Sequence, residues 1–159
     1  MLDSGVIGLL GSPYGDRDGA ECSSWLERVR SVGVGVKVPL ICYYEIRREF
    51  LRLAEDRRLD AISQGRWSES LRWLDDFASR IGVAEIDSKV MRLATTIWAE
   101  SRRRGLPTAP DSSLDIDVIL AATARRAGRG DRDVWVVTTN VAHLSRFVQA
   151  CTWDEFNAS

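Results

Sequence analysis

Acidic side chains stand at three separated places where chemistry is expected in this sequence. Asp3 follows the first apolar residues, Glu45 opens the helix expected after the second strand, and Asp115 and Asp117 open the helix expected before the strongest strand. The polar residue after that strand is Asn140. Ligands of open parallel sheets bind beyond the carboxyl ends of the strands. The pattern therefore predicts that Asp3, Glu45 and Asp117 share one pocket.

Three carboxylates in one pocket call for a divalent cation. Two carboxylates ~4 Å apart repel by about 4 kcal/mol at an effective dielectric of about 20. Oxygen ligands without cysteine or a fixed histidine suit Mg²⁺ or Mn²⁺. Each acid alone also has a structural alternative. Asp117 complements a helix dipole as a first-turn acid, and Glu45 pairs with Arg48 or Arg52 on its own helix.

Composition excludes several classes of protein. The chain has 159 residues and a formal net charge of -1, with three cysteines and one histidine. These counts exclude a disulfide framework and a zinc ribbon, and they favour the reducing cytoplasm. No apolar run approaches the ~20 residues of a membrane span, and no basic, signal-like segment opens the chain. Nearly all basic residues are arginine, which suits either phosphate recognition or a bias of genome composition.

Short β-rich runs alternate with longer amphipathic stretches. This alternation predicts a single α/β domain over residues 1–159, with a parallel sheet and helices on both faces. We expect helices over 20–32, 43–57, 68–80, 88–104 and 115–127, with Ser88 capping the fourth. We expect strands over 34–41, 82–86 and 134–138, then a short helix and a last strand near 148–151. Residues 106–114 form a predicted loop that contains two prolines.

Other catalytic chemistries find little support in the motifs. A serine hydrolase would need His143, the only imidazole, and no GxSxG turn is present. His143 stands beside Leu144 and is interpreted as structural. Gly33 and Gly35 lack the third glycine of a dinucleotide fingerprint, and no phosphate-binding GxxxxGK[ST] loop occurs.

Four segments together resemble the PIN-domain family. Residues 2–7 resemble its opening strand and aspartate, and residues 43–50 its second motif. Residues 117–124 resemble its aspartate followed by an alanine-rich helix, and residues 136–147 its fourth motif. Each motif is short, but the set follows the family's order over almost the whole chain.

The resemblance implies a three-layer α/β/α sandwich with a parallel sheet of order 3-2-1-4-5. It also implies a VapC-like toxin: a ribonuclease that is held by a cognate antitoxin and cleaves RNA to leave a 5′-phosphate and a 3′-hydroxyl. Asp3, Glu45 and Asp117 match the family's metal-binding and catalytic acids. Supporting positions are Asp115, Thr138, Asn140 and Ser4.

This sequence departs from the family pattern at three places. Asn140 stands where many members have an aspartate, and His143-Leu144 replaces a common Asp-Phe pair. These changes leave the second metal position open, and Asp115 is the candidate to supply its carboxylate. Only Met1 and Leu2 precede Asp3, so the first strand is expected to be either very short or clipped by the chosen start codon.

Two other readings compete with the ribonuclease. One is a non-cleaving PIN-like module that binds nucleic acid or protein, which the changes at Asn140 and His143 favour. The other is an unrelated small-molecule α/β enzyme. Metal-dependent cleavage of single-stranded RNA by the pure protein separates the first interpretation from both.

The segment from Trp67 to Ile81 predicts self-association. Its main apolar stripe faces the sheet, and Trp73 lies off that stripe. An extra exposed tryptophan would be unusual in a monomer of this size, and the resemblance implies pairing through these helices. We therefore expect a homodimer; the alternative is that Trp73 packs within its own chain, against the preceding helix.

Overall fold

The structure is a computed structural model that describes residues 1–15, 17–105, 114–128 and 134–157. Within them lie seven helices and four short strands, a mixed α/β fold. The elements in chain order are α1 (Ser4–Gly11), α2 (Arg17–Ser31), β1 (Val38–Pro39), α3 (Leu40–Ala54), α4 (Ala61–Ile81), β2 (Val83–Ala84), α5 (Ser88–Arg103), α6 (Ile116–Ala127), β3 (Trp135–Val137), α7 (Val141–Leu144) and β4 (Gln149–Cys151).

The strands form two parallel pairs, β1 with β2 and β3 with β4. The first residues of the chain run between them. Leu2 forms an isolated parallel bridge with Val137 and donates its backbone N–H to the Lys37 carbonyl at 3.2 Å. Asp3 in turn donates its backbone N–H to the Val137 carbonyl at 2.9 Å. The expected first strand is thus reduced to one bridge, and the two pairs are not joined into one continuous sheet.

Several predicted boundaries move, for local reasons. The strand expected over 34–41 is confined to Val38–Pro39, because Pro39 becomes the N-cap of α3. The helix expected from Ser68 begins seven residues earlier, where Asp60 accepts a hydrogen bond from the Ser63 backbone N–H. Asp87, not the predicted Ser88, caps α5 by accepting from two backbone N–H groups. Apart from Leu114, the predicted loop 106–114 lies outside the described residues.

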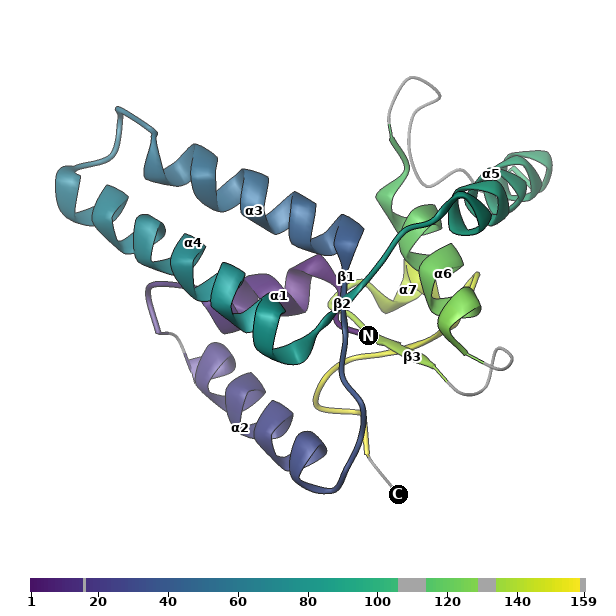
Figure 1. Cartoon of the computed structure of the whole chain (residues 1–159), viewed down its shortest axis with the longest axis horizontal. Coiled ribbons are helices and arrows are strands. Elements are labelled where there is room, and N and C mark those ends of the chain that lie inside the picture. Colours follow the sequence, from purple (N-terminus) through teal and green to yellow (C-terminus); the bar gives the residue numbers. More distant parts are fainter. Residues whose placement is uncertain (16, 106–113, 129–133, 158–159) are drawn as a thin grey trace.

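The core is centred on α1 and α6. Val6 and Ile7 of α1 are fully buried, and every residue of α6 from Val118 to Ala124 is buried. Helices α1–α4 lie to one side of the strands and α5–α7 to the other (Figure 1). Because α6 is buried from Val118 to Ala124, the acidic residues at its start are held on a rigid element.

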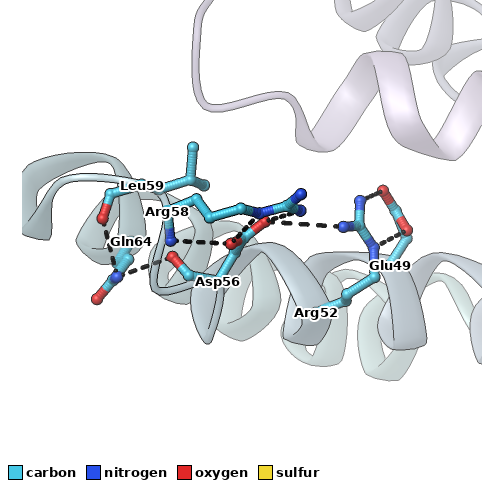
Figure 2. A network of polar contacts seen from close by, with 6 residues as sticks. All are labelled: Glu49, Arg52, Asp56, Arg58, Leu59 and Gln64. Atoms are coloured by element: carbon cyan, nitrogen blue, oxygen red, sulfur yellow. Dashed lines mark hydrogen bonds and ion pairs between the residues drawn. The ribbon is translucent and has the colours of Figure 1, made fainter.

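Helices α3 and α4 form a long antiparallel hairpin that extends away from the strands (Figure 1). Polar contacts close its outer end: Arg58 and Arg52 reach the Asp56 carboxylate, and Gln64 donates to the Asp56 and Leu59 carbonyls (Figure 2). These polar side chains therefore bind one another and the backbone of the turn.

Trp73 does not supply an exposed apolar patch. It stacks on Phe77 with ring centroids 4.7 Å apart, and its ring covers Gly11 of α1 so closely that a Cβ there would lie 2.6 Å from it. Trp73 thus packs within its own chain, but its described partners are α1 and its own helix α4 instead of the preceding helix, because the missing side chain of Gly11 makes room for the indole. Trp73 therefore no longer supports the predicted homodimer.

No helix among the described residues is long and apolar enough to cross a membrane. The three cysteines are unpaired and buried.

Candidate active site at the strand ends

Asp3 is buried where the first bridge ends and α1 begins. It is the N-cap of α1, and its Oδ1 accepts the Ser4 backbone N–H at 2.6 Å and the Ser4 hydroxyl at 3.3 Å. The Cys42 thiol of α3 donates to the same oxygen at 3.8 Å. A short apolar run followed by Asp-Ser is the local signal that places this carboxylate at a helix start.

Thr138 ties Asp3 to the end of β3. Its fully buried hydroxyl donates to Asp3 Oδ2 at 2.6 Å and accepts the Asn140 backbone N–H at 2.9 Å. Gly5 brings the start of α1 against the same turn, because a Cβ at this position would overlap the Thr139 hydroxyl. Asn140 itself is exposed and starts α7 without a side-chain cap. Thr138 thus orients Asp3, whereas the Asn140 amide makes no described contact with the acids.

Asp115 and Asp117 lie two residues apart at the start of α6 and differ in burial and in contacts. Asp115 is buried and caps the helix by accepting the Val118 backbone N–H at 3.2 Å. Asp117 is a first-turn acid whose side chain is 28% exposed. Burial, then the charges of Asp3 and Asp115, raise the pKa of Asp117 above its usual value. The fold therefore brings the Asp3 and Asp115 carboxylates within electrostatic reach of Asp117.

His143 is the neighbour that the sequence alone did not assign to the site. Its Nδ1 lies 3.5 Å from Asp117 Oδ2, and it opposes the upward shift in the pKa of Asp117. The interpretation of His143 as merely structural missed this contact. The available signal was its place in the fourth motif, where the family often has an acidic residue.

Glu45 lies at the edge of this group. It is half-buried on α3, one turn after Cys42. Burial, then the charge of Asp3 and more weakly that of Glu45, raise the pKa of the Cys42 thiol well above its usual value. Glu45 thus shares an electrostatic neighbourhood with Asp3 without a direct bond between them.

The donor set suits a hard divalent cation in kind. Asp3, Asp115 and Asp117 offer only oxygen ligands. Burial, and after it the charges of Asp3 and Asp115, raise the pKa of Asp117, and a bound cation would favour the charged form of this carboxylate. In the described ranges, however, no three His, Cys, Asp or Glu side chains stand close enough together to hold a metal ion. The residue types thus suit a divalent cation, but their side chains are not arranged as a compact set of ligands.

Neither a family model nor a curated protein matches the sequence. Solved structures do match it. VapBC2 from Rickettsia felis, bound to a DNA fragment from its promoter, covers 97% of this chain and 98% of that chain, with a TM-score of 0.70 and 16% identity. The chain has the VapC-like PIN fold. VapBC-1 from nontypeable Haemophilus influenzae covers 98% of both chains, with a TM-score of 0.66 and 16% identity.

These matches confirm the PIN-like fold that the four motifs predict, while the predicted sheet order 3-2-1-4-5 stays a prediction. At 16% identity they concern the fold alone. The assignment of individual residues therefore depends on the contacts described above.

Proposed function

We propose that residues 1–159 form a single-domain, Mg²⁺- or Mn²⁺-dependent endoribonuclease of the VapC type. The observation that carries the proposal is the meeting of Asp3, held by Thr138 at the end of β3, with Asp117 in the first turn of α6, within a VapC-like PIN fold. A fold gains nothing in stability by crowding carboxylates, so such a cluster at the strand ends is typical of a functional site.

In this proposal Asp3 and Asp117 are the principal ligands, and Glu45 acts directly or through water. A bound Mg²⁺ or Mn²⁺ would supply Lewis-acid polarisation of the scissile phosphate and a water of lowered pKa. Thr138 and Ser4 hold the Asp3 carboxylate in place. Asp115 anchors α6 and adds negative charge beside Asp117, and Asn140 stands at the rim, where it would face RNA.

The proposal includes partners and a finer topology. The matched structures are VapBC complexes, and we infer a cognate antitoxin of the VapB kind for this chain. A homodimer, a cytoplasmic location and the sheet order 3-2-1-4-5 belong to the same proposal. The hydrogen bonds of Leu2 to Lys37, next to β1, and of Asp3 to Val137 of β3 support that order.

The test is cleavage of a labelled single-stranded RNA by purified protein. We expect cleavage with Mn²⁺ or Mg²⁺, its loss in EDTA, and its loss in an Asp117→Asn variant purified in parallel. The products should carry a 5′-phosphate. A kinase should therefore label their 5′ ends only after phosphatase treatment. Cleavage that persists in EDTA or in the variant would refute the proposal, because the metal or Asp117 would then not be needed.

A second candidate is a PIN-like module that binds RNA without cleaving it. The residues Asn140 and His143 favour it, because they stand where many members of the family have carboxylates and so offer no carboxylate to a second metal position. RNA binding by the wild-type protein without cleavage under any divalent metal would select this function.

A further inference from the structure

A second group of charged residues gathers away from the acids, around a pocket of about 110 Å³. Three arginines from different elements line it: Arg104 at the C-cap of α5, Arg125 in the last turn of α6, and Arg146 just after α7. The remaining lining residues are Ile97, Glu100, Ser101 and Phe147. We call this group the arginine pocket.

One arginine of the pocket is fixed in place. Arg125 donates from Nε at 2.9 Å and from Nη2 at 2.6 Å to the Phe147 carbonyl. Two bonds to one acceptor hold the guanidinium plane, so that its remaining N–H groups are available in a set orientation. Arg104 and Arg146 are exposed at the mouth of the pocket.

Among the described residues, the arginines of the pocket are not paired with carboxylates, unlike five arginines elsewhere on the molecule. Ion pairs to neighbouring carboxylates engage arginines of α2, α3, α4 and the turn after α3, namely Arg17, Arg47, Arg52, Arg58 and Arg80. Arg104, Arg125 and Arg146 form no ion pair with any carboxylate in the described part of the chain. Glu100 is the single acid among the lining residues.

Helix ends alone do not explain the arrangement. A basic side chain in the last turn complements the helix dipole, which accounts for Arg104 and Arg125 taken singly. It does not account for their meeting Arg146 around one pocket, since like charges repel. A polyatomic anion removes that repulsion, and planar guanidinium groups bind phosphate oxygens with two parallel hydrogen bonds.

We propose that the arginine pocket binds one phosphodiester group of an RNA strand, at a site separate from the acids. The inference rests on the proposed function for the identity of the strand. Along α6, eight residues separate Asp117 from Arg125, or about 12 Å at the helical rise. The bound phosphate therefore lies a few nucleotides from the scissile bond, where it holds the strand and takes no part in the chemistry.

Two arginines nearer the acids are less suited to this task. Arg47 donates to the Asp75 carboxylate, which also accepts from Tyr43. Arg48 lies 5.6 Å from the centre of the Tyr44 ring, to which it is attracted as a cation. Both guanidinium groups already have partners on the α3–α4 hairpin.

The experiment measures RNA affinity in EDTA, where no cleavage interferes. A fluorescein-labelled, mixed-sequence single-stranded RNA is titrated with wild-type protein, with R104Q/R146Q, and with R66Q/R72Q across a series of KCl concentrations. Arg66 and Arg72 are exposed on α4, so this control removes the same charge elsewhere. Arg125 is left intact because its bonds to Phe147 support the fold.

We expect R104Q/R146Q to weaken binding about tenfold and to lower the slope of log K against log salt by about 0.7, the value for one phosphate of a single strand. The control should match the wild type. Equal weakening in both double variants would overturn the inference, because net charge alone would explain it. An unchanged affinity in R104Q/R146Q would overturn it too.

Two further arms separate the alternatives. If R104Q/R146Q loses affinity for a labelled poly-aspartate peptide while RNA binding is unchanged, the pocket recognises an acidic protein segment and the inference is wrong. If the wild-type protein binds RNA through the pocket but cleaves none with Mn²⁺, the pocket is supported and the nuclease function fails. If the wild-type protein cleaves RNA, and the two double variants have the same activity and the same RNA affinity, the nuclease function is supported and the arginine pocket is not an RNA site.

Discussion

Asp117 is the residue at which the metal-site proposal is tested most directly. Its pKa is raised in the folded protein, so the fold disfavours its charge and this cost grows as pH rises through the folded pKa. Asp117→Asn removes that cost, while the first-turn dipole contribution that it loses is only about 0.3–1 kcal/mol. We expect an unchanged or higher melting temperature in EDTA, together with loss of most RNA cleavage in Mn²⁺. A large drop in melting temperature with normal cleavage would make Asp117 a structural acid.

His143 is expected to position Asp117 rather than to react. Its Nδ1 lies 3.5 Å from the carboxylate, and loss of such an outer partner typically lowers metal affinity or activity by about 10–100-fold. We predict that His143→Ala raises the Mn²⁺ concentration needed for half-maximal cleavage by about tenfold and leaves the melting temperature nearly unchanged. His143→Gln, which keeps an N–H donor, should recover part of the loss. Faster cleavage in His143→Ala would contradict this role.

At the level of elements, two aspartate caps make helix stability depend on pH. Backbone hydrogen bonds from Ser63 and Val90 are the largest causes that lower the pKa of Asp60 and Asp87, at the starts of α4 and α5. Because these pKa values are lower in the folded than in the unfolded chain, the caps stabilise the protein above about pH 4. That contribution is lost as pH falls through the folded pKa. Urea unfolding of Asp60→Ala and Asp87→Ala should show a larger deficit at neutral pH than in acid, and a deficit independent of pH would exclude the charge as its cause.

The contact between α4 and α1 depends on Trp73. Its ring stacks on Phe77 and covers Gly11, so Trp73→Ala leaves a cavity, and we expect a loss of about 3–5 kcal/mol in unfolding free energy. The matched control is Ile62→Ala on the same helix, which is 72% exposed and should stay within about 0.5 kcal/mol of wild type. Urea titration measures both, and equal small effects would show that Trp73 does not pack against α1.

For the whole molecule, the proposed homodimer needs an interface other than Trp73. The α3–α4 hairpin carries Tyr44, Leu51 and Ile62 as exposed large apolar residues, and a specific dimer buries at least ~1,000 Å² in total. Light scattering at micromolar concentration should give twice the chain mass of 17.8 kDa. Leu51→Asp should return the protein to a monomer without loss of helicity. A wild-type monomer would remove the dimer from the proposal.

The order of the longer helices and the acid at the start of α6 were within reach of the sequence. Glu45, which was expected to open its helix, lies instead in the second turn of α3. Apolar periodicity predicted α5 and α6 to within one residue at each end, because amphipathic helices of this length repeat one pattern over several turns. The short strands were placed but overextended, since Val34–Val36 is apolar without being paired in the structure. A strand is defined by its neighbours, and a single chain segment carries no record of them.

Only the tertiary structure decided which side chains meet. Thr138 bonds to Asp3 across 135 positions of sequence, and His143 reaches Asp117 from a helix of four residues. The arginine pocket joins the ends of α5 and α6 with the turn after α7. None of these contacts follows from a spacing of 2 or 3.6 residues, the periods that local structure imprints on a sequence. They exist because the burial of α6 and the hydrogen bonds of Leu2 and Asp3 bring distant segments to one place, and that is a property of the packed chain as a whole.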